Sequence, residues 1–271
     1  AGIATSIGHA PQAALVDPAA GSVLSIAEAL TNIVWAPLSE GLDSVSLSAN
    51  WMWPCKNEGE DARLYRAVEA CSDFACSLGI NIPTGKDSLS MTQKYGKDKV
   101  YSPGTVIISA GAEVSDIRKV VSPVLRTGVD SMVYYIDFSF DKLKLGGSAF
   151  AQSLDKIGKE VPTVQDSEYF ANAFNAVQEL INKELILAGH DISAGGMITT
   201  MLEMNFANTE GGLEVSLDEI PEKDLVKILF SENPGILIQV EKTDEVEKIL
   251  KKAGIAFIRL ARPCDERHLL I

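Results

Sequence analysis

The chain carries the stretch His190-Asp191-Ile192-Ser193-Ala194-Gly195-Gly196 directly after an apolar run at residues 185–188. The pattern predicts a short strand that ends in a carboxylate and a hydroxyl, followed by two glycines and a helix over residues 197–206. A helix start presents unpaired N–H groups, glycine lets the backbone approach closely, and an aspartate at the turn can hold a hard cation. We therefore expect this stretch to hold an anion or a metal–phosphate group.

A second candidate pair, Glu28 and Asn32, lies far upstream on a predicted helix. Asp17 and Pro18 are typical of a helix start, and the apolar residues that follow recur at helical spacing: Val23, Ile26, Leu30, Ile33 and Val34. Glu28 and Asn32 are four residues apart, so both emerge on one face, off the apolar stripe. With Asp191 they supply two carboxylates and an amide oxygen, which suits Mg²⁺ sharing a nucleotide's phosphates. For the pair taken alone, an ordinary solvated helix face is the alternative.

Composition limits the class of protein. The 271 residues are 46% hydrophobic and 23% charged, as in a globular chain that buries a real core. The formal charge of −13 argues against binding to nucleic acid or to an anionic membrane, because both need Lys and Arg to meet phosphate. No apolar run approaches the ~20 residues of a membrane span. These features favour a cytoplasmic protein.

The cysteines and the start of the chain add two expectations. Four cysteines contain no Cys-x-x-Cys pair and only three histidines are present, so reduced thiols of a cytosolic protein are expected rather than a zinc site. The start lacks both Met and a charged region, so it is not a signal peptide and reads as part of a longer chain.

Strand and helix patterns are mixed without a strict βαβ rhythm, which favours an α+β fold over a doubly wound parallel sheet. Strands are expected at residues 43–51, 80–82, 104–114, 132–137, 213–217, 235–240 and 255–260, and helices at 60–78, from about 145, after the cap Asp166, at 223–230 and from the cap Thr243 to Gly254. The segment 122–130, with Pro123 and Gly128, reads as a change of domain.

The segment Gly85-Lys86-Asp87-Ser88 is not a P-loop. That motif needs a glycine five residues before Gly85, where the chain has Ile80, and Asp87 stands where the metal-binding hydroxyl belongs. The residues are expected to form a turn between strands. A role for Lys86 and Asp87 near a ligand stays open.

A Ser–His–Asp hydrolase is also disfavoured. His190 adjoins Asp191, but no Gly-x-Ser-x-Gly elbow exists. Adjacent residues of an extended segment also point to opposite sides. We expect no nucleophilic catalysis from this chain.

Five motifs in order resemble the large, single-chain family of phosphoribosylformylglycinamidine synthases. The likeness runs across essentially the whole chain, and its motifs are Glu28-Ala29-Leu30-Thr31-Asn32, Ser48-Ala49-Asn50-Trp51, Gly85-Lys86-Asp87-Ser88-Leu89-Ser90-Met91, Leu145-Gly146-Gly147-Ser148 and the opening stretch at residues 190–196.

The resemblance implies a fold and a reaction. In that family the synthase portion is a tandem of two halves, each like aminoimidazole ribonucleotide synthetase, and this chain resembles most of the second half. Residues 1–121 would then form an incomplete N-terminal-type domain and residues 122–271 the C-terminal-type domain. The family's reaction is ATP-dependent: ammonia from glutamine converts the formamide of formylglycinamide ribonucleotide into an amidine in purine biosynthesis.

The resemblance also implies the site. The second half of the family carries an auxiliary ADP with Mg²⁺ in a structural role, and Glu28, Asn32 and Asp191 match its metal ligands, while Ser193 matches a nucleotide contact. A further metal-binding Asp is expected upstream of Ala1. The catalytic half and the glutaminase domain belong to the remainder of the polypeptide, so we expect no turnover from this segment alone.

Two other functions stay open. In the first, the segment is a structural half-domain without a ligand that packs against the catalytic half, and the strand edges of its incomplete domain drive self-association. In the second, it is a stand-alone relative with selenophosphate or thiamine-monophosphate chemistry, which the motifs match less well.

Overall fold

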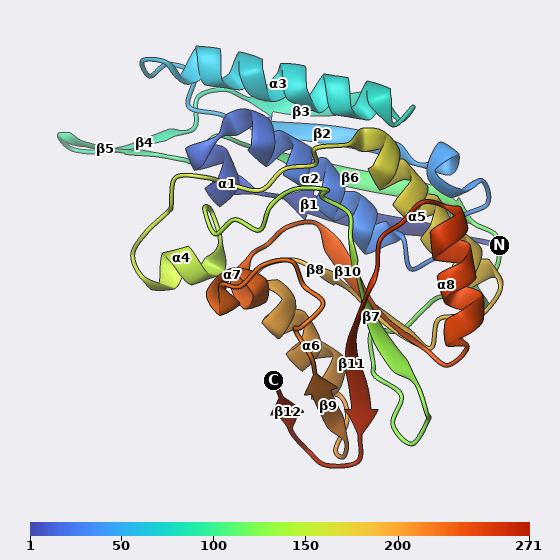
Figure 1. Cartoon of the computed structure of the whole chain (residues 1–271). Coiled ribbons are helices and arrows are strands. Elements are labelled where there is room, and N and C mark those ends of the chain that lie inside the picture. Colours follow the sequence, from blue (N-terminus) through green and yellow to red (C-terminus); the bar gives the residue numbers. More distant parts are fainter.

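The computed structural model describes all 271 residues as two sheets covered by helices, with a small hairpin that projects from the body (Figure 1). The first part contains, in order, β1 (Gly2–His9), α1 (Pro11–Val16), α2 (Pro18–Ile33), the short 3-10 helix η1 (Gly41–Ser44), β2 (Ser46–Met52), α3 (Glu60–Ser77), β3 (Asn81–Ser88), β4 (Thr92–Tyr95), β5 (Asp98–Tyr101), β6 (Thr105–Val114) and η2 (Ile117–Lys119).

The second part begins at β7 and ends with a short strand next to the C-terminus. It contains, in order, β7 (Met132–Asp137), α4 (Ala149–Ser153), α5 (Ser167–Asn182), β8 (Ala188–Ile192), α6 (Gly196–Phe206), β9 (Gly212–Val215), α7 (Leu225–Phe230), β10 (Gly235–Val240), α8 (Thr243–Lys252), β11 (Ile258–Cys264) and β12 (Leu269–Leu270).

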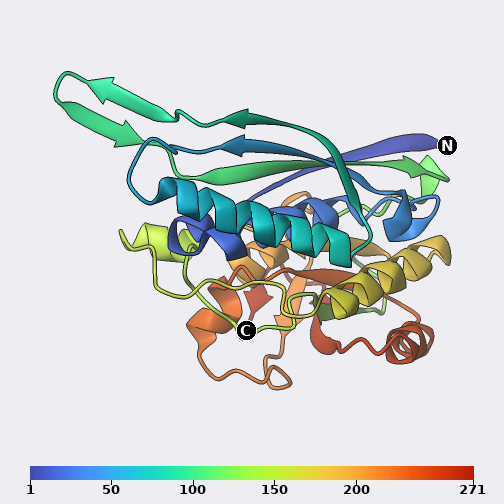
Figure 2. The same ribbon diagram turned by 90° about the horizontal axis from the view of Figure 1, so that it is seen from above.

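The first sheet has the order β1-β6-β2-β3, with antiparallel neighbours except for the parallel pair β2–β3. Helices α2 and α3 cover one face, and no helix covers the other (Figure 2). Alternate residues of β2 follow this division, since Leu47 and Ala49 are buried while their neighbours are only half-buried. On the edge strand β1, Ile3 and Ile7 are 82% and 58% exposed.

The second sheet has the order β12-β9-β11-β7-β10-β8 and is antiparallel apart from the edge pair β9–β12. Its central strands β7 and β10 are buried on both faces. Tyr134 and Ile136 pack in one cluster with α5 and α8, whereas Val133 and Tyr135 pack in another with α6. The mixed, mainly antiparallel architecture confirms the predicted α+β class.

One hydrophobic cluster of 45 buried residues joins the two parts of the chain. Phe74 of α3 packs edge-on against Phe170 of α5, with 5.7 Å between ring centroids. Gln178 of α5 accepts a hydrogen bond from Leu38 N at 2.8 Å and donates to Val34 O at 2.6 Å. This buried contact holds the first part firmly against the second. The division between residues 121 and 122 itself stays a prediction.

Several predicted helix starts are present. The Asp17 side chain accepts from Ala19 N, Asp166 accepts from Tyr169 N at the start of α5, and Ser148 accepts from Ala151 N at the start of α4. Thr243 is the first residue of α8 rather than its cap, and the cap residue Lys242 makes no capping hydrogen bond.

The turn predicted at residues 83–88 is wrong, because these residues belong to β3. Thr84 to Ser88 pair in parallel with β2, and Gly85 lies opposite Ala49. A Cβ at Gly85 would lie 2.2 Å from Ala49 O, so glycine is required here by close strand pairing rather than by a turn. On α3, the periodicity of apolar residues would place Val68 on the buried face, yet Val68 is 43% exposed, and Ala67 and Ala75 are buried.

All four cysteines are free, as expected, and only Cys71 is buried. None of the helices combines the length and the apolar character that a membrane span requires.

Candidate functional site

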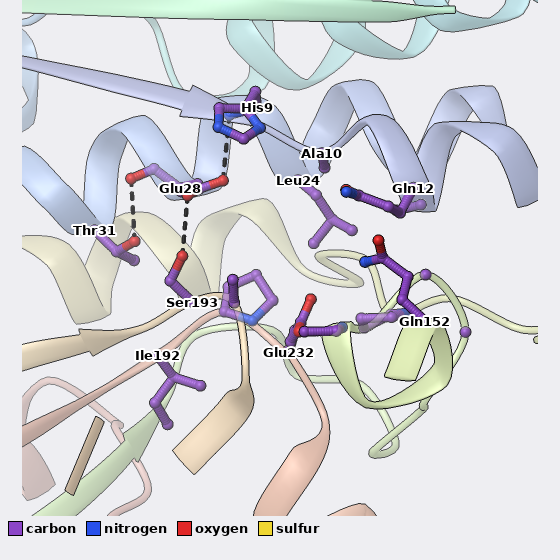
Figure 3. Close-up of a pocket in the computed structure, with 17 residues that line it drawn as sticks. His9, Ala10, Gln12, Leu24, Glu28, Thr31, Gln152, Ile192, Ser193 and Glu232 are labelled. Carbon is purple, nitrogen blue, oxygen red and sulfur yellow. Dashed lines mark hydrogen bonds between the residues drawn. The ribbon is translucent and has the colours of Figure 1, made fainter. Parts of the chain in front are cut away.

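A cavity of 140 Å³ lies between the two parts of the chain, where glycine-rich segments of the second part approach α1 and α2 of the first. It is lined from α2 by Glu28 and Thr31, from the end of β1 by His9, from the segment after β8 by Ser193, and from the loop before β10 by Glu232 (Figure 3). Residues from these four separate segments of the chain therefore converge on one small space.

Glu28 is the most connected side chain of this cavity. Its Oε1 accepts a hydrogen bond from Ser193 Oγ at 3.0 Å, and its Oε2 accepts one from His9 N at 3.2 Å. Burial raises the pKa of Glu28; the hydrogen bonds from His9 and Ser193 act against that rise, and the charge of Asp191 adds to it. The contact with Ser193 joins residues 165 positions apart and confirms that the two stretches meet in space.

Asp191 lies on β8 beside the cavity, paired in register with Ile236 of β10. Its side chain is only 7% exposed. Asp191 is not among the lining residues, which at this point are Ile192, Ser193 and Ala194, but its charge acts on Glu28. The structure therefore brings Glu28, Asp191 and Ser193 together.

Asn32, like Asp191, is not among the residues that line the cavity. It is exposed, and its Nδ2 donates to Glu28 O, one turn back along α2, at 3.0 Å. Thr31, which lines the cavity, donates its Oγ1 to the same carbonyl oxygen at 3.2 Å. No protein group donates to Asn32 Oδ1, so that oxygen is free to accept.

The expectation that α6 begins with free N–H groups is only partly met. Gly195 and Gly196 both have positive φ angles, of 92° and 74°, which favour glycine at these positions. However, Gly195 N donates to Glu232 Oε1 at 2.8 Å, and Gly196 N donates to Ser193 O at 3.0 Å. A carboxylate of the protein itself therefore occupies the start of this turn.

Glu232 is the site residue that the sequence analysis missed. Its Oε1 also accepts from Ala149 N at 2.7 Å, so it connects the segment before α4 to the segment before α6. Burial raises the pKa of Glu232; the two backbone hydrogen bonds lower it, and the charge of Glu28 raises it further. No motif surrounds Glu232 in the sequence, and only the path of the chain between α7 and β10 brings it into the cavity.

Glycines let the second part of the chain approach α1 closely. Gly147 has a φ of +73°, and a Cβ there would lie 2.7 Å from the Cα of Ala13. A Cβ at Gly146 would lie 2.2 Å from Glu160 O. The paired glycines are therefore required by backbone contacts that shape the cavity wall.

The side chains of His190 and Asp191 do not point to opposite sides of the strand, so the expectation from an extended segment is wrong here. His190 Nδ1 lies 3.3 Å from Asp191 Oδ1, and His190 Nε2 lies 3.2 Å from Glu203 Oε2. Burial lowers the pKa of His190, but its contacts with Asp191 and Glu203 outweigh that effect and raise it. No serine or cysteine contacts this imidazole, so the pair has no nucleophile to activate.

No group of three or more His, Cys, Asp or Glu side chains is close enough to hold a metal ion by itself. The oxygen donors near the cavity are two interacting carboxylates, Glu28 and Asp191, and one turn along α2 from Glu28 lies the amide group of Asn32. This hard, incomplete donor set fits Mg²⁺, which keeps several waters or phosphate oxygens and takes only a few protein ligands.

Comparison with known families matches almost the whole chain. Residues 1–113 match the FGAR-AT PurM_N-like domain, and residues 132–268 match the C-terminal domain of AIR synthase related proteins. A probable phosphoribosylformylglycinamidine synthase of Caenorhabditis elegans is 40% identical over 268 residues, and the human synthase is 38% identical over 262. The matches cover 94% and 96% of this chain but only 20% and 19% of those relatives, so the chain spans about a fifth of their length.

Solved structures share the fold. Thermotoga maritima PurL complexed with FGAR superimposes with a TM-score of 0.76 at 17% identity, covering 98% of this chain and 42% of that one. Hydrogenase maturation protein HypE in complex with ATP gives a TM-score of 0.67 at 15% identity, covering 97% and 77%. The chain belongs to the AIR synthase related family and, within it, to the phosphoribosylformylglycinamidine synthases.

Proposed function

We propose that this chain is the part of a phosphoribosylformylglycinamidine synthase that carries an auxiliary Mg²⁺–nucleotide site. The observation that carries the proposal is the contact between Glu28 and Ser193, which unites the two predicted stretches at one acidic cavity. Relatives about 40% identical over nearly the whole chain, and PurL structures complexed with ATP and ADP, support the same reading.

In this proposal Glu28, Asn32 and Asp191 hold Mg²⁺, and Ser193 contacts the nucleotide. The repulsion between the charges of Glu28 and Asp191 favours binding of a divalent cation. Two neighbouring carboxylates that are partly removed from water are stabilised when a cation neutralises them. Once bound, Mg²⁺ would neutralise the phosphate charge of the nucleotide. Asn32 Oδ1, which accepts no hydrogen bond from the protein, would be a third protein ligand.

The size of the cavity suits the phosphate end of the ligand. Its 140 Å³ is below the ~300 Å³ of the smallest typical ligand pockets. A metal–diphosphate group would therefore lie inside, between Glu28 and the glycine-rich segments. The nucleoside would extend toward Gln12 and Gln152, which line the same cavity.

The whole enzyme would convert formylglycinamide ribonucleotide, glutamine and ATP into the amidine during purine biosynthesis in the cytoplasm. We assign no catalytic residue to this chain. The catalytic half and the glutaminase domain, elsewhere in the same polypeptide, would perform the chemistry. Amidine product formed by this chain alone from ATP, the ribonucleotide and ammonia would contradict that division of labour.

Thermal unfolding tests the ligand directly. A ligand that binds only the folded chain raises the unfolding temperature by an amount set by its concentration relative to Kd. We expect stabilisation by ADP with Mg²⁺, and little by ADP with a chelator. An equal rise in unfolding temperature with ADP in both conditions would contradict a role for Mg²⁺ in binding.

A second candidate function is a structural half-domain without a ligand. The open face of the first sheet favours it, because Ile3 and Ile7 of the edge strand β1 are largely exposed. This surface would pack against the catalytic half and would associate with itself when that half is absent. Absence of any nucleotide effect in the unfolding experiment would favour this alternative.

A further inference from the structure

Glu232 connects the two glycine-rich walls of the cavity through a single oxygen. Its Oε1 accepts the N–H of Ala149 at 2.7 Å and that of Gly195 at 2.8 Å. The first belongs to the segment that enters α4, and the second to the segment that enters α6. No other side chain forms hydrogen bonds with both segments.

The two segments differ in how they are held. Before α4, Gly146 N donates to Glu160 O at 2.9 Å and Gly147 N to Ile157 O at 2.7 Å, whereas before α6 Gly196 N donates only to the nearby Ser193 O. Gly195 and Gly196 both adopt positive φ, a conformation that glycine adopts without steric cost. The N-cap residue of α6, Gly195, has no side chain to cap the helix. The carboxylate of Glu232 supplies the hydrogen-bond acceptor that the segment before α6 lacks.

The other oxygen of Glu232 has a different role. No protein group donates to Oε2, and the side chain lines the cavity (Figure 3). The charge of Glu28 acts on Glu232 across this space. The charge of Glu232 would therefore repel an incoming phosphate, and a cation bound to that phosphate would offset the repulsion.

We propose that Glu232 is a positioning and selectivity residue of this cavity. Through Oε1 it holds the segments before α4 and α6 at a fixed separation, and through its charge it excludes a nucleotide that carries no metal. The second part rests on the proposed function, because it concerns the same nucleotide site.

Two variants of the full chain separate these roles. Glu232→Gln keeps an oxygen that accepts both N–H groups and removes the charge, whereas Glu232→Ala removes both. Asp166→Asn and Asp166→Ala are matched controls, because Asp166 accepts a backbone N–H at the start of α5 and does not line the cavity.

Amide hydrogen exchange tests the positioning role. We expect Glu232→Ala to speed exchange at Ala149 and Gly195 by about tenfold or more, while Glu232→Gln preserves protection. The Asp166 variants should leave both amides unchanged. Unchanged protection of both amides in Glu232→Ala would overturn the positioning role, and this result needs no ligand. Loss of protection in both Glu232 variants alike would also contradict it.

Titration with ADP tests the selectivity role. With a chelator present, Glu232→Gln should bind ADP about tenfold more tightly than the unaltered chain, whereas affinity for Mg-ADP should change by less than about threefold. Glu232→Ala should bind Mg-ADP more weakly. An unchanged ratio of the two affinities in Glu232→Gln would overturn selectivity. If the unaltered chain bound neither form, the proposed function and the selectivity role would both be wrong, while the exchange experiment would still decide the positioning role.

Discussion

Glu28 and Glu232 are half-buried carboxylates that form no ion pair with a Lys or Arg. Burial raises the pKa of each, and each is affected by the charge of a neighbouring carboxylate. Neither has a Lys or Arg within ion-pair distance, whereas Glu247 elsewhere in the chain has two. Such an arrangement destabilises the free protein and becomes favourable when a cation binds.

Replacing Glu232 by Gln should stabilise the ligand-free chain at neutral pH. A carboxyl group whose folded-state pKa is raised favours the folded state most at pH values below its unfolded pKa, and that advantage is lost as the pH rises through the folded pKa. Gln keeps the acceptor and removes the charge, so we expect the unfolding temperature at pH 7 to rise by about 2–4 °C.

The pH dependence distinguishes this explanation from improved packing. The stabilising effect of Glu232→Gln should shrink as the pH is lowered toward 4, where the native carboxyl group is protonated as well. Thermal unfolding followed by circular dichroism at pH 4, 5.5 and 7 measures the difference. A constant difference across this range would mean that charge is not the cause.

At the scale of single residues, Glu28, Asp191 and Ser193 could be predicted as site residues from the sequence, but Glu232 could not. The first three lie in short patterns whose chemistry is visible locally: a helix face, and a strand end followed by two glycines. Glu232 lies in a loop whose approach to Ala149 and Gly195 depends on tertiary structure. The exposure of Asn32 likewise depends on how α2 is rotated against the sheet.

At the scale of secondary-structure elements, glycine is required at position 147 because it lets the segment before α4 contact α1. Gly147→Ala would combine an unfavourable positive φ with a clash against the backbone of Ala13. We expect a loss of about 2–5 kcal/mol in the free energy of unfolding. Chemical denaturation measures this, with Gly59→Ala as the control.

Gly59 has a φ of +79°, and nothing lies within 4 Å of the position a Cβ would take. Its substitution should therefore lose only about 1–2 kcal/mol, from backbone strain alone. Equal losses in the two variants would show that the contact between α1 and the glycine segment does not constrain the fold.

Helix α8 is attached to the second sheet by a network around Glu247. Glu247 accepts hydrogen bonds from Tyr134 Oη at 2.8 Å, Arg259 Nε at 2.8 Å and Lys251 Nζ at 3.0 Å. Burial by itself would raise the pKa of Glu247, but the hydrogen bonds from Arg259, Lys251 and Tyr134 outweigh it and lower the pKa to about 2.

Glu247→Gln should destabilise the chain at neutral pH by about 1–3 kcal/mol, less than a fully buried network would, because Arg259 is half-exposed. A carboxyl with a lowered pKa stabilises the fold above its unfolded pKa, and this contribution is lost as the pH falls from about 4.5 toward about 2. The difference between the variant and the unaltered chain, measured by denaturation, should therefore vanish in that range. A difference that persists at pH 2 would contradict this origin.

Elements with strong periodicity or clear caps were predictable, and those that depend on pairing were not. The α5 helix follows its Asp166 cap as expected, and the apolar residues that recur at helical spacing form its buried face: Phe170, Phe174, Val177 and Ile181. Residues 83–88 contain Pro, Gly, Asp and Ser and look like a turn, yet β2 draws them into the sheet through parallel hydrogen bonds. Local propensity is overridden there by tertiary pairing.

At the scale of the whole molecule, the exposed edge and open face of the first sheet predict self-association. Substituting Ile3 and Ile7 together by Lys should weaken it, since charged residues on an edge strand oppose pairing. Sedimentation velocity at several concentrations measures the effect, with Leu225→Lys, an exposed apolar residue of α7 away from this sheet, as the control. A strictly monomeric unaltered chain would refute the prediction.

The α+β class and the order of most elements were accessible from the sequence because burial patterns report them locally. The hydrophobic cluster shared by both parts could not be predicted from the sequence. It depends on contacts between distant residues, such as the hydrogen bond between Gln178 and Leu38, which are 140 residues apart. The open sheet face and the projecting β4–β5 hairpin (Figure 2) likewise follow from tertiary packing rather than from any local pattern.

A calorimetric titration of Mg-ADP into this chain tests the central claim most directly, with Asp191→Ala as the site variant and Asp166→Asn as the control outside the cavity. We predict binding of one Mg-ADP to the unaltered chain and to Asp166→Asn, with affinity lowered at least about tenfold in Asp191→Ala. Equal binding by all three proteins, or no binding by the unaltered chain, would contradict a nucleotide–metal site formed by Glu28, Asn32, Asp191 and Ser193.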